Sequence, residues 1–111
     1  MTLNAGDLIT VDFPGVTGVK RRPAVVLSFA TYHATRPDVV IGLITSSTTA
    51  LGATDYELLD WSAAGLRVAS VFRSFIVTLP RSTNLISIGH LSDQDWQGVR
   101  GAVKVALAVF D

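Results

Sequence analysis

The stretch Leu8-Ile9-Thr10-Val11-Asp12-Phe13 decides the fold class of this chain, and Pro14-Gly15 follows it directly. Polar side chains alternate with apolar ones in this stretch, which is typical of a β-strand with one buried face. A Pro-Gly pair is a strong turn signal. The start of the chain therefore predicts a strand from Leu8 to Phe13 that ends in a turn.

Further short apolar runs predict more strands in the same way. They cover Ala24–Phe29, Val39–Thr45, Val68–Leu79 and Leu85–Ile88, and Pro23, Pro80 and Gly89 lie beside them. Short strands joined by turns rich in Gly, Pro, Ser and Thr are typical of a small barrel or sandwich. We therefore expect a mainly β, barrel-like domain.

The last part of the chain changes to a helical period. Ser92 is followed three residues later by Asp95, which is a capping-box pattern at the start of a helix. Behind this cap, apolar residues recur every three or four positions and predict one buried stripe, formed by Trp96, Val99, Val103, Ala106, Leu107 and Phe110. Upstream, Trp61, Ala63 and Ala64, closed by Gly65, predict one short helical turn.

Length and composition limit the possible classes of protein. A chain of 111 residues fits a single domain over 1–111, and 49% hydrophobic against 16% charged residues excludes a disordered chain. The absence of cysteine excludes a disulfide scaffold, a thiolate zinc site and a cysteine nucleophile. Nine basic and nine acidic residues argue against a charge-driven nucleic-acid binder but leave a local basic patch open. With no apolar run long enough for a membrane and no signal peptide, we expect a cytoplasmic protein that makes no membrane contact.

Few residues are candidates for chemistry. Lys20-Arg21-Arg22 is the one cluster of three cations, and it either lies in a solvated turn or binds phosphate. The hydroxyl run Thr45–Thr49 consists either of ordinary turn residues or of phosphate ligands. Arg73 interrupts an apolar run, so it points either to solvent or into a paired site. His33, which we expect in a loop, and His90 are isolated, so no metal site is predicted.

Several motifs together resemble the MazF/PemK family, the toxins of bacterial type II toxin–antitoxin pairs. The most specific motif is Gly6–Phe13 followed by Arg22–Ser28. The others are weak singly but occur in the family's order: Ile44–Ser46, Asp55–Leu58, Ala64–Leu66, Ser70–Arg73, Thr78-Leu79 and Ile88–Ser92.

This resemblance implies an SH3-like small β-barrel with a C-terminal helix, and a homodimer. It also implies an endoribonuclease that cuts single-stranded RNA at short sequences with no metal or other cofactor, and that a cognate antitoxin inhibits. Contact with DNA is expected only through the antitoxin. Carried over position by position, Arg22 and Thr45 match the family's catalytic residues. We expect Lys20, Arg21, Ser46 and Arg73 to bind the flanking RNA.

Two departures from the family pattern leave a second interpretation open. Acids found in some members are replaced here by Thr17 and Phe75, which leaves the general base unassigned. The alternative is a binding toxin on the same fold, either a gyrase inhibitor like those of the CcdB family or a degenerate RNA binder. The chain ends in Val109-Phe110-Asp111 and lacks the Trp-Gly-Ile tail of the CcdB-like toxins, which favours the nuclease.

Overall fold

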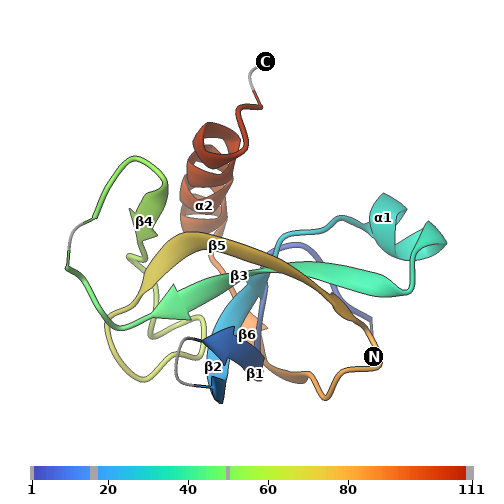
Figure 1. Ribbon diagram of the computed structural model, residues 1–111. Coiled ribbons are helices and arrows are strands. Elements are labelled where there is room, and N and C mark those ends of the chain that lie inside the picture. The colour runs from blue at the N-terminus through green and yellow to red at the C-terminus, as the bar shows by residue number, and fades with distance from the viewer. Residues whose placement is uncertain (1, 16–17, 50, 110–111) are drawn as a thin grey trace.

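The computed structural model describes residues 2–15, 18–49 and 51–109. Over these residues the chain forms a six-stranded sheet and two helices (Figure 1). In chain order the elements are β1 (Asp7–Gly15), β2 (Gly18–Val26), α1 (Ala30–Thr35), β3 (Asp38–Thr45), β4 (Asp55–Glu57), β5 (Val71–Pro80), β6 (Ile86–His90) and α2 (Asp93–Ala106). The mainly β fold with a C-terminal helix is confirmed.

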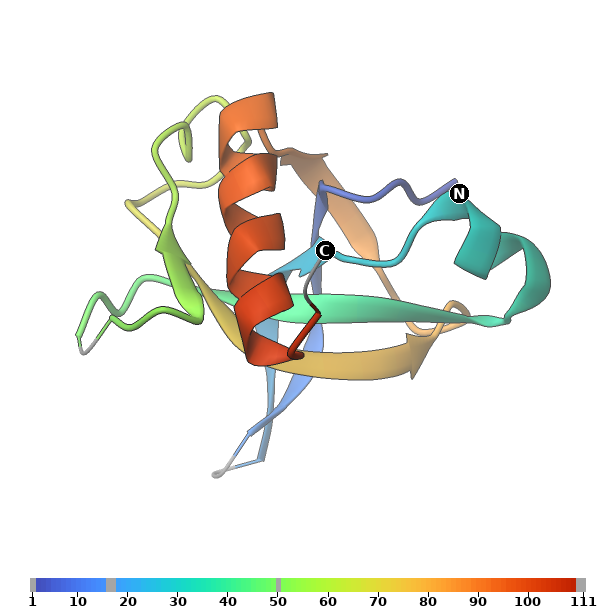
Figure 2. The ribbon, with the colours of Figure 1, turned by 90° about the horizontal axis from the view of Figure 1, so that it is seen from above.

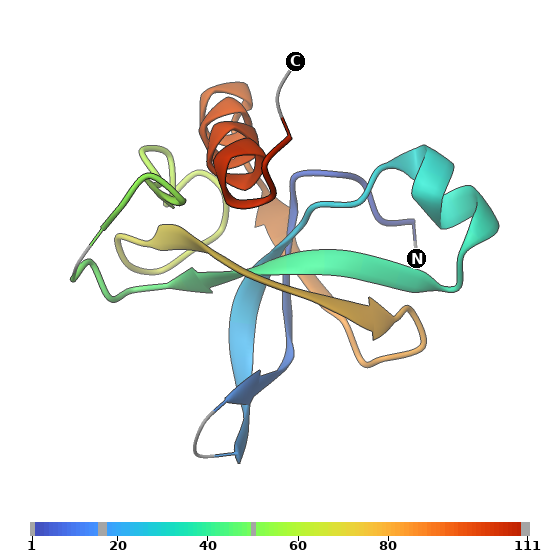
Figure 3. The same ribbon diagram turned by 45° about the horizontal axis from the view of Figure 1, so that its top comes forward.

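The sheet has the strand order β4-β5-β3-β2-β1-β6, and all neighbouring strands are antiparallel. It is strongly bent, so that the β1–β2 hairpin runs across β3 and β5 at a steep angle (Figure 3). Within the described residues β4 and β6 are edge strands that do not pair with each other. The ladder is therefore not closed, and the expected barrel closure is not confirmed.

The bent sheet has a hydrophobic cluster on each face. Neighbouring residues of β1 point to opposite faces, because Leu8 belongs to one cluster and Ile9 to the other. The Leu8 cluster includes Phe72 of β5 together with Val99 of α2. Figure 2 shows α2 along one side of the sheet, where it packs against β4 and β5. The start of β1 is therefore buried on both faces, whereas the alternation in the sequence predicted one buried face.

The N-terminus of α2 is capped as the sequence predicts. The Ser92 hydroxyl oxygen accepts a hydrogen bond from the Asp95 backbone N–H at 3.2 Å. The reciprocal half of a capping box is replaced by another contact. Asp95, which is fully buried, accepts instead from the Tyr56 hydroxyl and from the backbone N–H of Leu59 and of Asp60. This carboxylate therefore joins α2 to β4 and to the segment that follows it.

The predicted stripe of α2 is buried only along its first turns. Val99 is buried, and Trp96 and Val103 are half-buried against the same cluster. Ala106 and Leu107 are exposed, so the prediction that they are buried is wrong, because the helix end extends past the sheet. Phe110 lies outside the described residues, and Ala102, which the pattern did not include, is buried.

The strand ends predicted from the sequence are wrong for the first two strands. Pro14-Gly15 belongs to β1, where Gly15 pairs with Gly18, so the predicted turn begins later. The strand predicted over Ala24–Phe29 instead runs from Gly18 to Val26, which places the basic triplet in β2. Cross-strand pairing explains the extension, since Arg21 lies opposite Asp12 in the β1–β2 ladder.

Several other elements also differ from the sequence prediction. The run predicted from Val68 becomes a strand only at Val71, and the last strand is Ile86–His90. The short helix α1 and the strand β4 were not predicted. His33 lies in α1 and not in a loop, and its Nε2 atom lies 2.6 Å from the Ser28 hydroxyl oxygen. The predicted turn at Trp61 is confirmed by the 3.1 Å hydrogen bond from Leu66 N–H to its carbonyl oxygen.

Candidate functional site

A cavity of about 450 Å³ lies where the middle of β2 and the C-terminal end of β3 meet the segment between β4 and β5. Thr10 of β1 and Ile88 of β6 complete its wall. Three arginines, Arg21, Arg22 and Arg67, line it. We call this site the arginine cavity. No carboxylate and no imidazole lines it within the described part of the chain, so it is cationic although the chain has a formal net charge of zero.

Arg22 and Thr45 come together in the arginine cavity because of the β2–β3 register. Ala24 of β2 pairs with Leu43 of β3 in an antiparallel ladder. Arg22 lies two residues before Ala24 on β2, and Thr45 lies two residues after Leu43 on β3, beyond this last pair of the ladder; both residues line the cavity. Two positions that are 23 residues apart in the sequence thus line one cavity.

These two side chains differ in the hydrogen bonds that they make within the protein. The half-buried side chain of Arg22 makes no hydrogen bond or ion pair with any described residue. The Thr45 hydroxyl oxygen accepts a 3.2 Å hydrogen bond from the Ser47 backbone N–H. This bond orients the hydroxyl and leaves its own hydrogen to donate. The pair offers a guanidinium and a hydroxyl donor to an anion.

Arg21 also lines the cavity, but its guanidinium is held in place. It donates to the carbonyl oxygens of Asn84 at 2.9 Å and Thr10 at 3.0 Å, and lies 3.7 Å from the Asp12 carboxylate. Lys20 is exposed in β2 and does not line the cavity. Arg21 therefore ties the hairpin to the segment before β6, while its charge remains beside the cavity.

The structure separates the two remaining predicted RNA-binding residues. Ser46 is exposed and lines the arginine cavity. Arg73 lies in a different hollow, where its Nη1 atom forms a 3.0 Å ion pair with Asp55 Oδ2. Its Nη2 atom donates to the carbonyl oxygens of Ser47 and Thr49. Arg73 was expected to point either to solvent or into a paired site, and the structure shows the paired arrangement. Its side chain holds the segment after β3 against β5.

Arg67 is a residue of the cavity that the sequence analysis missed. It is exposed in the segment between the Trp61 turn and β5. A single arginine in a turn region has no pattern that separates it from other solvated arginines. The available signal was its position two residues after Gly65, whose φ of 103° marks a left-handed turn.

Of the two positions at which some family members carry acids, one lies within the described residues. Phe75 of β5 is 49% exposed and lies in the hollow beside Arg73. Thr17 lies outside the described residues. Phe75 does not line the arginine cavity and adds no general base to it.

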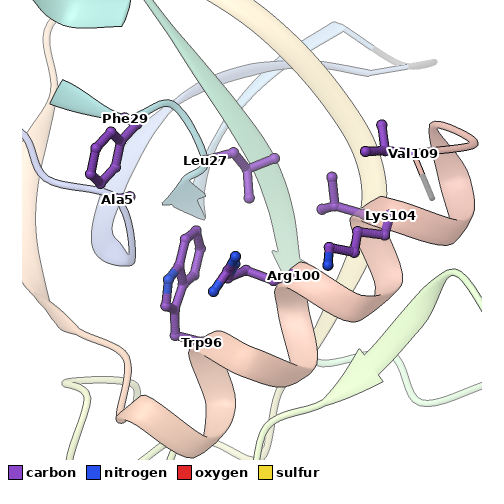
Figure 4. A pocket seen from close by; sticks show the side chains of 8 residues that line it. Ala5, Leu27, Phe29, Trp96, Arg100, Lys104 and Val109 are labelled. Atoms are coloured by element: carbon purple, nitrogen blue, oxygen red, sulfur yellow. The ribbon is translucent and has the colours of Figure 1, made fainter. Parts of the chain in front are cut away.

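A second hollow of about 430 Å³ lies along α2, from Trp96 in its first turn to Lys104 in its last turn. Figure 4 shows Trp96, Arg100 and Lys104 on α2, with Leu27 and Phe29 across from them. Phe29 is 68% exposed, which is unusual for so large an apolar side chain. This groove is mainly apolar, in contrast to the arginine cavity.

The described part of the chain has neither a metal centre nor a membrane-spanning helix. No group of three or more His, Asp or Glu side chains comes close enough together to hold a metal ion. Neither described helix has the length and apolar character needed to cross a membrane.

The bent sheet, the C-terminal helix and the cationic cavity define a small mainly β protein, and comparison with known proteins gives its family. The family described as the PemK-like, MazF-like toxins of type II toxin–antitoxin systems matches residues 4–107. Because the match covers nearly the whole chain, this protein belongs to that family. The comparison with curated proteins returns no match.

Solved structures share this fold at low sequence identity. A MazE–MazF structure from Deinococcus radiodurans is 22% identical, with a TM-score of 0.78 over 99% of this chain and 100% of that one. A mycobacterial endoribonuclease in complex with its cognate antitoxin is 19% identical, with a TM-score of 0.79 over 100% and 99% of the two chains. The Mycobacterium tuberculosis toxin MazF-mt6 is 21% identical, with a TM-score of 0.76 over 95% and 99%.

Proposed function

We propose that this protein is an endoribonuclease toxin that cuts single-stranded RNA at short sequences through attack by the RNA's own 2′-OH group. The observation that carries the proposal is the presence of Arg22 of β2 and Thr45 of β3 in the lining of one cationic cavity. Membership in the MazF-like toxin family supports the same activity. So does the fold shared with a mycobacterial endoribonuclease.

Arg22 acts in this mechanism by neutralising charge. Attack of the 2′-OH on the neighbouring phosphorus produces a pentacoordinate phosphorane with additional negative charge on its oxygens. A guanidinium stays protonated at any relevant pH and can donate to two phosphate oxygens at once. Because Arg22 has no described intramolecular partner, its donors are available to the phosphate without breaking an existing bond.

Thr45 acts by positioning. Its hydroxyl is oriented by the bond from Ser47 N–H, so its hydrogen can be donated to a phosphate oxygen or to the 2′ oxygen. Holding the 2′ oxygen in line with the phosphorus removes much of the entropic cost of attack. Since no carboxylate or imidazole lines the described cavity, the proposal assigns orientation and charge neutralisation to the protein and does not assign a general base.

The family also supports proposals about assembly. We infer that the chain forms a homodimer with the SH3-like barrel architecture of its family, and that a cognate antitoxin inhibits it in the cytoplasm. The shared fold with a MazE–MazF structure and with an endoribonuclease bound to its antitoxin supports the antitoxin partner. DNA contact is expected only through that antitoxin.

The experiment is to incubate the purified protein with a long RNA and map the new 5′ ends. We expect cuts at a short recurring sequence that the Arg22→Ala variant does not make. The matched control is Arg100→Ala, because Arg100 is an exposed arginine on α2 that does not line the arginine cavity. Intact RNA after incubation with the folded wild-type protein would favour the binding toxin over the nuclease.

A further inference from the structure

The arginines of this chain fall into two groups. In the larger group, each guanidinium donates to a described protein group; its members are Arg21, Arg36, Arg73, Arg81 and Arg100. In the smaller group, the side chain makes no hydrogen bond or ion pair with any described residue; its members are Arg22 and Arg67. Both members of the smaller group line the arginine cavity.

This distribution points to a ligand with more than one anionic group. A guanidinium that donates to carbonyl oxygens or to a carboxylate has part of its hydrogen-bonding capacity occupied. Arg22 reaches the cavity from β2, and Arg67 reaches it from the segment before β5. Neither guanidinium group donates to a described protein group, and the two come from different elements. Each can therefore donate to two oxygens of its own phosphate group, so the pair fits two phosphates better than a single phosphate.

The segment that carries Arg67 is firmly anchored. A Cβ atom added at Gly65 would overlap the Ile88 carbonyl oxygen, and one added at Gly89 would overlap that of Ala64, so this segment lies directly on β6. Within it, the Ser70 hydroxyl donates to the Val68 carbonyl oxygen at 2.8 Å. An anchored backbone keeps Arg67 beside the cavity before any ligand arrives, which lowers the entropic cost of binding.

The size and lining of the cavity suit a nucleotide unit. Its volume of about 450 Å³ lies within the range of small-molecule ligand sites, roughly 300–1,000 Å³. Leu66 and Val68, on either side of Arg67 in the sequence, and Ile88 of β6 provide apolar surface in the same cavity. Such surface can pack against a base or a ribose, while the arginines bind the phosphates on either side.

We propose that Arg67 binds the phosphate adjacent to the scissile one, so that the cavity grips two successive phosphates of a single RNA strand. This inference rests on the proposed nuclease function and adds to it a second substrate contact. Arg22 acts at the reacting phosphate. Arg67 holds the strand and is a substrate-binding residue, so its removal affects binding more than the chemical step.

The test measures how binding depends on salt. The probe is a fluorescein-labelled random-sequence 12-mer with 2′-O-methyl sugars, which cannot be cut by 2′-OH attack. Fluorescence anisotropy gives Kd from low to moderate salt for the wild type, Arg67→Ala, Arg67→Lys and the Arg100→Ala control. We expect Arg67→Ala to bind about tenfold more weakly. Its slope of log K against log salt should be shallower by about 0.7, the value for one phosphate contact on a single strand.

The Arg67→Lys variant separates the effect of the positive charge from that of the planar guanidinium group. Arg67→Lys should keep the salt slope of the wild type, because the phosphate contact keeps its charge, while Kd weakens through loss of the planar fork. On a cleavable RNA, Arg67→Ala should raise KM and change kcat little. A salt slope for Arg67→Ala equal to those of the wild type and Arg100→Ala would overturn the proposal.

The outcomes also separate this inference from the proposed function. If the wild type cuts RNA while Arg67→Ala keeps the wild-type slope, the second phosphate contact is wrong and the nuclease stands. If Arg67→Ala changes the slope while the wild type leaves long RNA intact, the nuclease is wrong and the phosphate contact stands. Circular dichroism and thermal melting of Arg67→Ala check that this exposed substitution leaves the fold intact.

Discussion

The Tyr56 hydroxyl donates a 2.9 Å hydrogen bond to Asp95 Oδ1, and the Asp95 carboxylate is completely buried in the first turn of α2. The same carboxylate accepts from the backbone N–H of Leu59 at 3.0 Å and of Asp60 at 2.8 Å. Three donors from the β4 region therefore converge on one residue of the helix. The chain continues from Leu59 and Asp60 into the segment that carries Arg67 and lines the arginine cavity. The buried carboxylate therefore fixes the start of this segment against α2.

Removing the Tyr56 hydroxyl should destabilise the protein and change how its stability depends on pH. At neutral pH, Tyr56→Phe should lower the free energy of unfolding by about 1 kcal/mol, since Asp95 keeps its two backbone donors. Burial, followed by the hydrogen bond to Asp95, raises the pKa of Tyr56 to about 12. Urea denaturation at neutral pH measures the first effect, and a series above pH 10 measures the second.

The sign of the alkaline effect follows from proton linkage. The unfolded Tyr56 loses its proton near the ordinary pKa of about 10, while the folded one keeps it until about pH 12. The stabilisation is complete below pH 10 and is lost between these values. Tyr32, whose pKa is raised by its hydrogen bond to Asp38, adds to this loss. Tyr56→Phe should therefore show a shallower alkaline loss than the wild type, and an unchanged slope would contradict the assignment.

Two glycines of α2 provide a matched pair for testing how the helix packs. A Cβ atom at Gly98 would overlap the ring of Tyr56, whereas one at Gly101 would meet nothing within 4 Å. Gly101→Ala should stabilise the protein by about 1 kcal/mol through helix propensity. Gly98→Ala should destabilise it by about 1–3 kcal/mol, because the ring has to shift. Thermal melting of both variants measures this difference, and equal shifts of Tm would show that Gly98 does not pack on Tyr56.

The close approach of Gly89 to Ala64 should be required for activity as well as for stability. A Cβ atom at Gly89 would overlap the Ala64 carbonyl oxygen, which is backbone and cannot rotate away. We expect Gly89→Ala to displace the segment of Arg67 and to weaken RNA binding, with Gly101→Ala as the control. Binding of the 2′-O-methyl RNA measures the effect. Wild-type affinity in a folded Gly89→Ala protein would mean that this segment does not contribute to the RNA site.

The local part of this fold could be predicted from sequence, while the contacts between distant segments could not. The pattern Ser92-x-x-Asp95 correctly predicted the helix cap, because a cap depends on residues within one turn. The same pattern could not show that the Asp95 side chain bonds to Leu59 and Asp60, more than thirty residues earlier. Arg21 likewise lies outside the strand predicted over Ala24–Phe29, because its strand conformation depends on pairing with β1.

In the candidate site too, local patterns could be predicted from the sequence, while contacts between distant segments could not. Arg22 and Thr45 were identified through the family resemblance, and their closeness depends on the β2–β3 register, which no local spacing encodes. The apolar run around Arg73 indicated an unusual arginine, but its pairing with Asp55 required the β4–β5 contact. Arg67 was missed because its place at the cavity depends on the packing of glycines on β6.

Arg22 should be the residue on which the rate depends most. If its guanidinium stabilises the phosphorane, Arg22→Ala should lower the cleavage rate by about 10²–10³-fold, the usual cost of one lost electrostatic donor. Arg22→Lys should recover only part of the rate, because an ammonium lacks the planar fork. Single-turnover cleavage of RNA measures both variants, and Arg100→Ala is the control. Wild-type rates in Arg22→Ala would move the reaction to another surface of the protein.

Cleavage should require the 2′-OH of the substrate and no added metal. The residues of the arginine cavity provide guanidinium and hydroxyl donors, and these stabilise a phosphate directly. Hydrolysis by water would need an activating group, whereas attack by the adjacent 2′-OH needs orientation and charge neutralisation, which Thr45 and Arg22 can provide. The products should then be a 2′,3′-cyclic phosphate and a 5′-OH, which mass spectrometry of the fragments can identify.

Two substrate and solvent changes test this route separately. An RNA with a single 2′-deoxy sugar at the scissile position should bind with nearly the affinity of the all-ribose strand and remain uncut, because the nucleophile is gone while the phosphates that Arg22 and Arg67 contact remain. EDTA should leave the rate on the all-ribose strand unchanged, whereas added salt should weaken binding through the phosphate contacts. Cutting of the deoxy strand would transfer the attack to water. Loss of activity in EDTA that magnesium restores would require an ion in the reaction, and either result would replace the 2′-OH mechanism.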